Sequence, residues 1–202
     1  MAVIGTDIEL AVAMIREGRL VALPTDTIYG LASDALNEKA VEEIYITKNR
    51  PLDKPIIAMI GDFDHLNEIC QNIEFAAKKL ADKYWPGALT MVFDAKSNVP
   101  SILLAKGSTL GVRIPNHPMT LKILNRFNSP LAVTSANITD QANPKTAKEV
   151  NDQIGDKIDY ILDGGPSQIG LESTIIKFEN NNPKIIRLGA ITEAEIISTL
   201  HL

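Results

Sequence analysis

The sequence has little of several residue types that would point to particular chemistries. It contains one cysteine, Cys70, and three histidines that lie far apart along its 202 residues. A single cysteine excludes an internal disulfide, and the scattered histidines lack the spacing of zinc ligands. We therefore expect no metal centre built from protein side chains.

Charge of one sign and long apolar runs are also missing. Lys and Arg number 20 against 25 Asp and Glu, a net charge of −5, which argues against a protein that coats nucleic acid with a generally basic surface. The N-terminal stretch lacks a basic segment and is interrupted by charged residues, and no apolar run reaches the ~18 residues of a membrane span. The sequence thus predicts a cytoplasmic protein with no signal peptide and no membrane contact.

What remains is an ordinary globular composition, with 45% hydrophobic and 22% charged residues. A chain of this length can bury roughly 70% of its unfolded surface, so it should fold alone. The length predicts one domain over residues 1–202.

Hydrophobic periodicity predicts helices alternating with strands in the first two thirds of the chain and mostly strands in the last third. A first helix should follow Thr6 and Glu9, which have the spacing of a capping box. The stretch PTDTIYGLASDA is interpreted as a loop. Further helices are predicted over residues 37–48, 64–70, 73–84, 119–127, 146–154 and 192–200. Strands are predicted over residues 19–23, 56–60, 89–93, 109–114, 130–134, 160–162, 173–178 and 184–188.

This alternation favours an α/β fold: one open, twisted sheet of mixed parallel and antiparallel strands with flanking helices. In such sheets ligands bind in the crevice at strand ends. Polar loops follow Leu23, Ile114, Val133 and Leu162. We expect the site to be assembled from these loops.

Side-chain cations gather beside these loops and at one helix end: Lys48, Arg50, Lys54, Arg113, Lys145 and Arg187. Arginine offers a planar fork for carboxylate or phosphate, whereas lysine acts as a compact charge, so one site with both could hold a nucleotide and a carboxylate. Two alternatives, in which these cations have only structural roles, stay open. Lys48, Arg50 and Lys54 could complement a helix dipole in solvent, and Arg113 and Arg187 could form salt bridges at strand edges.

Hydroxyl and amide side chains crowd other loops: Thr25, Thr27, Thr134, Ser135, Asn137, Ser173 and Thr174. Each group by itself could cap a helix or stabilise a turn. Their joint occurrence with the cations favours a polar binding site.

Familiar motifs do not account for the site. Gly165 and Gly170 have P-loop spacing, but Leu171-Glu172 stands in place of Lys-Ser/Thr, so the segment is interpreted as a glycine-rich turn or mobile flap. No nucleophile elbow accompanies His65, His117 or His201, which disfavours serine hydrolysis. His117 is interpreted as a helix-start residue. The Trp85-Pro86-Gly87 turn is interpreted as packing and left outside the site.

Several stretches taken together resemble the YrdC-like threonylcarbamoyl-AMP synthases, in the family's order over roughly residues 8–190. They are PTDTIYGLASDA, KNRPLDKP, WPGALT, GVRIPNHP, TSAN with NPKT, and LESTIIKF with IIRLGAI. Two hallmarks are present, Lys48-x-Arg50 and Ser135-x-Asn137. The resemblance implies the YrdC-like fold with a concave, locally positive face, in the form that lacks an extra C-terminal domain.

The resemblance also implies an activity. L-threonine, bicarbonate or carbon dioxide, and ATP would give threonylcarbamoyl-AMP and pyrophosphate, which supplies the threonylcarbamoyladenosine modification of tRNA. The implied partners are downstream tRNA threonylcarbamoyl-transferase proteins, with weak tRNA or RNA contact as a further option. Magnesium would arrive with ATP, because the sequence offers no obvious carboxylate cage.

Family roles carry over position by position. The threonine-binding positions are Thr27, Arg113 and Ser173. The ATP-binding positions are Arg50, Lys54, Thr109, Ser135, Asn137, Asn143 and Arg187, and Lys48 with Arg50 forms the catalytic pair on the phosphates. Three positions depart from the family pattern: Met59 replaces a His of some relatives, Asp140 a usual Gly, and Leu188 a usual Pro.

The implied chemistry needs no protein nucleophile, since a carbamate oxygen attacks the α-phosphorus while cations stabilise charge on the phosphates. Water-sensitive intermediates predict that residues 164–171 or 137–144 close over the site. Two other functions stay open: a non-catalytic RNA-binding module on the same fold, and a related enzyme acting on another carbamoyl or acyl phosphate.

Overall fold

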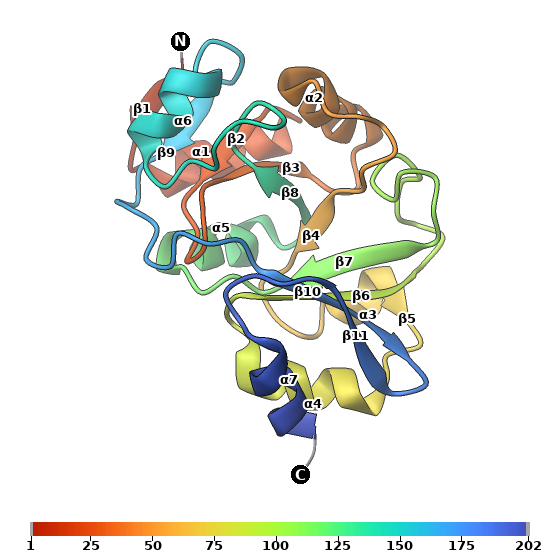
Figure 1. Ribbon diagram of the computed structural model, residues 1–202. Helices are drawn as coiled ribbons and strands as arrows, with labels where there is room; N and C mark the ends of the chain where they lie inside the picture. Colours follow the sequence, from red (N-terminus) through yellow and green to blue (C-terminus); the bar gives the residue numbers. More distant parts are fainter. Residues whose placement is uncertain (1, 201–202) are drawn as a thin grey trace.

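The computed structural model describes residues 2–200, and Figure 1 shows them as one sheet with helices packed around it. Met1, His201 and Leu202, and with them both ends of the domain expected over residues 1–202, lie outside the described residues. No helix within residues 2–200 has the length and apolar character needed to cross a membrane.

The strands of the sheet are short. They are β1 (Val3–Gly5), β2 (Val21–Leu23), β3 (Gly30–Asp34), β4 (Ile57–Met59), β5 (Cys70–Gln71), β6 (Leu89–Ala95), β7 (Thr109–Arg113), β8 (Leu131–Ser135), β9 (Tyr160–Leu162), β10 (Thr174–Glu179) and β11 (Asn182–Arg187). Their spatial order is β1-β9-β2-β3-β8-β4-β7-β6-β10-β11, with β5 paired to β6. Parallel pairs such as β4 with β7 and β6 with β10 occur in the same sheet as antiparallel pairs such as β4 with β8 and β6 with β7, which confirms the mixed sheet.

The helices are α1 (Ile8–Arg16), α2 (Glu38–Lys48), α3 (Leu66–Ile69), α4 (Phe75–Tyr84), α5 (Pro118–Phe127), α6 (Ala147–Ile154) and α7 (Glu193–Leu200). They cover both faces of the sheet. Successive residues of a strand point to opposite sides, so apolar side chains on each side need helices to pack against. In β2, Val21 and Leu23 face a cluster with α1 and α5, whereas Ala22 faces a larger cluster that includes residues of α2, α4 and α6. Both cores together hold the strand ends in place.

Three sequence expectations need correction. The cap of α1 is Asp7, whose Oδ1 accepts from the N–H groups of Glu9 and Leu10, so Thr6 does not cap it. Cys70 belongs to β5 and not to a helix. The supposed loop after Pro24 contains β3, a central strand paired with β2 and β8.

Candidate active site

A cavity of about 170 Å³ opens at the strand ends. Apolar side chains of β4, β8 and β10 form part of its wall: Ile57, Met59, Val133 and Ile175. Its polar lining contains Thr25, Thr27, Arg50, Arg113, Ser135, Glu172, Ser173 and Arg187. Three arginines against one glutamate make this lining positive, as an anion-binding site requires.

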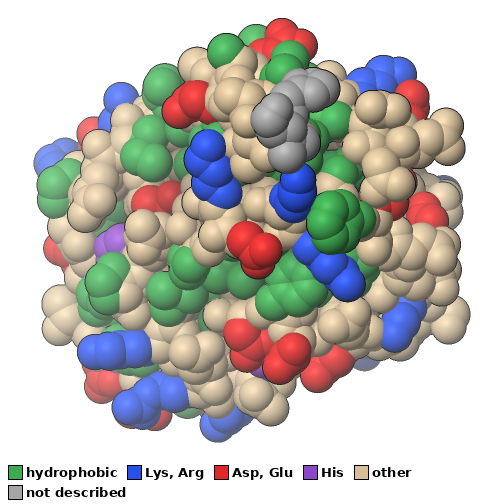
Figure 2. Space-filling model, turned by 90° about the horizontal axis from the view of Figure 1, so that it is seen from below, with side chains coloured by type: hydrophobic (Ala, Val, Ile, Leu, Met, Phe, Trp, Pro, Cys, Tyr) green, Lys and Arg blue, Asp and Glu red, His purple; other side chains and the backbone are tan. Residues whose placement is uncertain are grey.

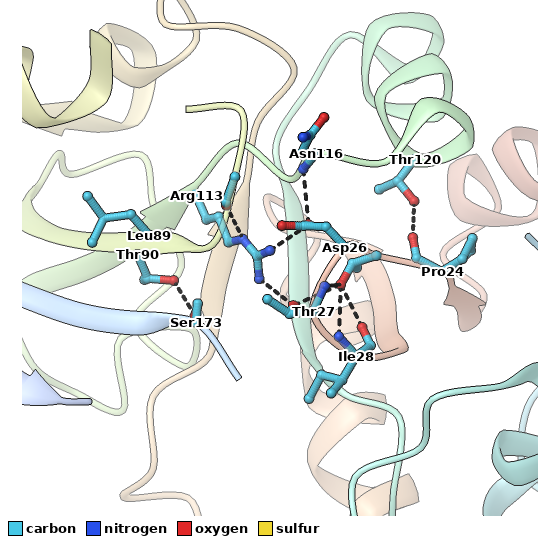
Figure 3. A network of polar contacts seen from close by, with 12 residues as sticks. Pro24, Asp26, Thr27, Ile28, Leu89, Thr90, Arg113, Asn116, Thr120 and Ser173 are labelled. Carbon is cyan, nitrogen blue, oxygen red and sulfur yellow. Dashed lines mark hydrogen bonds and ion pairs between the residues drawn. The ribbon is translucent and has the colours of Figure 1, made fainter. Parts of the chain in front are cut away.

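Arg113, the last residue of β7, is the most firmly held of these arginines (Figure 3). It is 2% exposed, and its Nη2 donates to Asp26 Oδ1 at 2.6 Å. Nη1 donates to Thr27 Oγ1 at 2.7 Å and Nε to the Gly87 carbonyl at 2.8 Å. Burial lowers the pKa of Arg113 below its usual range and Asp26 opposes the shift, and an arginine stays charged in either case.

Two turns supply these acceptors. In the turn after Pro24, Thr25 Oγ1 donates to the Ile28 carbonyl and accepts from the Thr27 and Ile28 N–H groups, which fixes the turn. Thr25 Oγ1 also lies 2.9 Å from Thr27 Oγ1 and so holds the Thr27 side chain. In the other turn, a Cβ on Gly87 would lie 2.5 Å from the Tyr84 carbonyl, so only glycine fits. The Trp85-Pro86-Gly87 turn, interpreted from the sequence as packing alone, thus also supports an arginine of the cavity lining.

Asp26 is a site residue that sequence reasoning missed. It is 3% exposed, and its Oδ1 accepts from both Arg113 and the Asn116 N–H, while Oδ2 has no partner among the described residues. A buried arginine needs a nearby carboxylate, because an unpaired buried charge is strongly destabilising. That requirement, applied to the acid beside Thr27, is the signal that could have identified it.

Ser173 and Arg187 form a second polar group of the cavity. Ser173 Oγ lies 2.8 Å from Thr90 Oγ1, and the Ser173 carbonyl accepts from Arg187 Nη2 at 2.9 Å. Arg187 Nη1 lies 2.9 Å from Glu172 Oε1, and both side chains are more than one third exposed. This pair is therefore open to solvent and to a ligand, unlike Asp26 with Arg113.

Arg50 reaches the cavity because α2 ends just before it. Asn49 adopts the left-handed conformation with φ 50°, and the Arg50 N–H donates to the Tyr45 carbonyl at 2.9 Å. The Arg50 side chain then donates from Nε to the Lys54 carbonyl at 3.0 Å and from Nη2 to the Pro55 carbonyl at 2.8 Å. Neutral carbonyls hold this guanidinium, so its charge is available to an anion.

Lys48, the last residue of α2, turns inward and is 1% exposed. Its Nζ donates to the carbonyls of Ser135 and Asn137 and, at 3.1 Å, to Asn137 Oδ1. Burial and the nearby Arg50 lower the pKa of Lys48 to about 7, and Glu172 acts in the opposite direction. Lys48 therefore lies behind the cavity and not in its lining.

The glycine-containing segment 164–171 is attached to the same turn that holds Arg113. Ile169 N–H donates to the Asp26 carbonyl and Gly170 N–H to the Thr27 carbonyl, each at 2.9 Å. Tyr29 Oη donates to the Gly165 carbonyl at 2.7 Å, and burial raises the pKa of Tyr29 to about 12. The segment thus lies over the turn that holds Arg113.

The structure brings six of the predicted site residues into the cavity lining: Thr27, Arg50, Arg113, Ser135, Ser173 and Arg187. The other five lie outside that lining: Lys48, Lys54, Thr109, Asn137 and Asn143. Thr109 begins β7, at the opposite end from Arg113, and lines a separate hollow. Lys54 contributes its carbonyl to Arg50, while its ammonium is half-exposed and 4.0 Å from Asp140.

The three departures from the family pattern occupy different surroundings. Met59 lines the cavity and is paired with Arg113 in the β4–β7 register. Asp140 has φ 68°, the left-handed region that glycine adopts at lower cost. Leu188 is 60% exposed beside Arg187. Met59 is therefore the departure placed to affect a bound ligand.

Within residues 2–200, no group of three or more His, Cys, Asp or Glu side chains is placed to hold a metal ion. Glu172, the carboxylate of the cavity lining, is paired with Arg187, and Asp26 with Arg113. The donor set present fits anions better than cations. His117 is the N-cap residue of α5, which confirms it as a helix-start residue.

Comparison with known proteins gives consistent results. The family model Sua5_yciO_yrdC, described as telomere recombination, matches residues 13–189. A threonylcarbamoyl-AMP synthase of Pyrococcus abyssi is 40% identical over 94% of this chain and 56% of its own length. A putative threonylcarbamoyl-AMP synthase of Mycobacterium tuberculosis is 32% identical over 94% of this chain and 87% of its own.

A solved structure of P. abyssi Sua5 complexed with L-threonine superposes with a TM-score of 0.95 and 36% identity, covering 100% of this chain and 61% of that one. The chain thus spans little more than half the length of the P. abyssi protein. Since the family model matches residues 13–189 and the relatives are 32% to 40% identical, the chain belongs to the Sua5/YciO/YrdC family.

Proposed function

We propose that this protein is an L-threonylcarbamoyladenylate synthase that uses L-threonine, bicarbonate and ATP. The observation that carries the proposal is that Arg113, in the cavity lining, still has guanidinium N–H groups without a protein acceptor in the described part of the chain. Of the five N–H groups of a guanidinium, three donate within the protein and two are left for a carboxylate. The likeness to P. abyssi Sua5 complexed with L-threonine supports this assignment.

In the proposed complex, the threonine carboxylate binds Arg113, with the hydroxyls of Thr27 and Ser173 beside it. Met59, paired with Arg113 across β4 and β7, lies on the apolar side of this pocket. Both hydroxyls are fixed, Thr27 by Arg113 and Ser173 by Thr90. Side chains that are already fixed before the ligand binds lower the entropy that binding has to overcome.

The amine of threonine combines with bicarbonate to give a carbamate and water. A carbamate oxygen then forms a bond to the α-phosphorus of ATP, and the bond to the departing pyrophosphate breaks. No protein atom becomes covalently attached, so the side chains act by positioning and by stabilising charge. We assign Arg50 and Arg187 to the phosphates, because their charges are the more exposed ones of the cavity.

Magnesium would enter with ATP, held by its phosphates and water, and would screen the triphosphate charge. The protein carboxylates near the cavity are engaged by arginines. We further propose that the protein acts in the cytoplasm and passes its product to tRNA threonylcarbamoyl-transferase proteins.

The test is pyrophosphate release from ATP, measured with each substrate omitted in turn, together with mass spectrometry of the product. We expect release only when threonine and bicarbonate are both present. In Arg113→Ala the KM for threonine should rise roughly 10- to 150-fold, because a hydrogen bond to a charged group contributes about 1.5–3 kcal/mol. An unchanged threonine KM in this variant would reject the assignment.

The RNA-binding alternative predicts another outcome: salt-sensitive RNA affinity with no turnover. Figure 2 disfavours it for the face shown, where Lys and Arg side chains are interspersed with Asp and Glu. Such a surface lacks the single-sign potential that holds a nucleic-acid backbone.

A further inference from the structure

Lys48 contributes a buried cation that the proposed reaction does not use directly. An ammonium group has three N–H donors, and three oxygen atoms accept from Lys48 Nζ: the carbonyls of Ser135 and Asn137 and the Asn137 Oδ1 atom. The side chain is 1% exposed and is not among the residues that line the cavity. Its donors are thus saturated by protein.

The same residue also holds the loop through its backbone. The Lys48 carbonyl accepts from the Thr139 N–H at 3.1 Å, so one residue at the end of α2 contacts the loop at both Asn137 and Thr139. Asn137 extends the connection, because its Nδ2 donates to the Gln141 carbonyl at 2.6 Å. Lys48 therefore holds the loop that follows β8 through both its side chain and its backbone.

We infer that Lys48 is a positioning residue that fixes the Ser135–Gln141 loop and through it the Ser135 wall of the cavity, and does not itself contact the phosphates. Moving Nζ to a phosphate would break three hydrogen bonds and leave two backbone carbonyls and a buried amide oxygen without their donor. Arg50, two residues on, has unused N–H groups in the cavity and takes the phosphates instead.

The charges around Lys48 agree with its assignment to the loop and with that of Arg50 to the phosphates. Arg50 and Glu172 are the charged groups that face Lys48, and they act on it in opposite directions. Burial opposes the charged form of the Lys48 amine, whereas its three oxygen acceptors favour that form. The ammonium is therefore held by the loop it organises.

Amide hydrogen exchange in the ligand-free protein tests the loop directly. In Lys48→Met, which keeps the length but removes the donors, we expect residues 136–141 to exchange roughly 10-fold faster, the factor that corresponds to about one net hydrogen bond. Lys39→Met is the matched control, since Lys39 is exposed on the same helix. Equal protection of residues 136–141 in both variants would overturn the proposal.

A second pair of variants covers the case in which Lys48→Met folds poorly. Asn137→Asp keeps an oxygen acceptor for Nζ and adds an opposite charge, but like Asn137→Leu it loses the Nδ2 donor to the Gln141 carbonyl. The two variants therefore differ in the Nζ contact, and Asn137→Asp should keep clearly more loop protection than Asn137→Leu. If the Asp and Leu variants behave alike, the Nζ contact does not hold the loop.

NMR of ¹⁵N-lysine-labelled protein separates positioning from phosphate contact. We expect the Lys48 Nζ signal to keep its chemical shift when a non-hydrolysable ATP analogue and Mg²⁺ are added, while the Arg50 Nε signal moves in ¹⁵N-arginine-labelled protein. A shift of the Lys48 signal comparable to that of Arg50 would assign Lys48 to the phosphates and overturn the proposal.

A third test, the KM of Lys48→Met for each substrate, requires that the proposed function is correct. Lys48→Met should raise the KM for ATP and leave that for threonine unchanged, because Ser135 and not Arg113 is displaced; a general loss of structure would raise both and contradict the proposal. The exchange and NMR experiments need no turnover, so failure of the proposed reaction and failure of this inference are distinguishable.

Discussion

Two arginines of the same cavity, Arg113 and Arg50, are held in different ways. Arg113 is buried at a strand end and paired with a buried carboxylate, a hydroxyl and a carbonyl. Arg50 is partly exposed after a helix end and held by two carbonyls without a counter-charge. The first arrangement is rigid and suits a small anion of fixed shape, whereas the second leaves charge and freedom for a flexible polyphosphate.

The largest difference should lie in stability. Arg113→Ala leaves Asp26 buried without its counter-charge, and the free energy of unfolding should fall by about 3–5 kcal/mol. Arg50→Ala should lower it by no more than about 1 kcal/mol, because it leaves only exposed carbonyls. Urea denaturation of both variants measures the contrast.

A double variant, Arg113→Ala with Asp26→Ala, is the control, since it removes both charges and should recover part of the loss. Equal unfolding free energies for Arg113→Ala and Arg50→Ala would show that burial of the pair does not distinguish the two arginines.

A smaller contrast should appear in substrate use. Arg50→Met should lower kcat/KM for ATP roughly 10- to 100-fold with little change in the KM for threonine, since a charged hydrogen bond contributes about 1.5–3 kcal/mol. Lys54→Met is the matched comparison, because the Lys54 carbonyl that holds Arg50 remains. An effect of Lys54→Met as large as that of Arg50→Met would place the Lys54 ammonium on the nucleotide.

The smallest effect concerns His117, beside the Asp26 end of the site. Burial lowers its pKa below 6.5, with Asp26 and Gly164 in opposition. The folded protein then binds this proton more weakly than the unfolded chain, so its contribution to stability is complete above pH 6.5 and is lost as the pH falls towards the folded pKa.

His117→Asn should therefore lose less stability than the wild type between pH 7 and pH 5, measured by urea denaturation at each pH. Parallel pH profiles for the two proteins would contradict the assigned burial effect.

Much of the fold followed from hydrophobic periodicity, but β3 did not. Its sequence, Gly-Leu-Ala-Ser-Asp, has no β-branched or aromatic residue, which is the local signal for a strand. Its position comes from pairing with β2 and β8 and from burial of Leu31 and Ala32. Tertiary contacts make this segment a strand, and such contacts cannot be predicted from the local sequence alone.

The site was predictable where residue type and strand ends coincide, as for Arg113 and Arg187. The site was not predictable where the direction of a side chain matters. The sequence spacing places Lys48 close to Arg50, but only the structure shows that the Lys48 ammonium is buried while Arg50 lines the cavity. Gly87 was missed for a similar reason, because its carbonyl meets Arg113 across 26 positions of sequence.

The turn between Pro24 and Ile28 performs two tasks with two different sets of atoms. Its side chains hold Arg113, while its backbone carbonyls at Asp26 and Thr27 accept from residues 169 and 170. Side-chain replacements at these positions therefore leave the overlying segment attached, whereas Ile169→Pro would remove one of its two bonds to the turn without touching the arginine. The contacts that hold Arg113 and the attachment of residues 164–171 can consequently be altered one at a time.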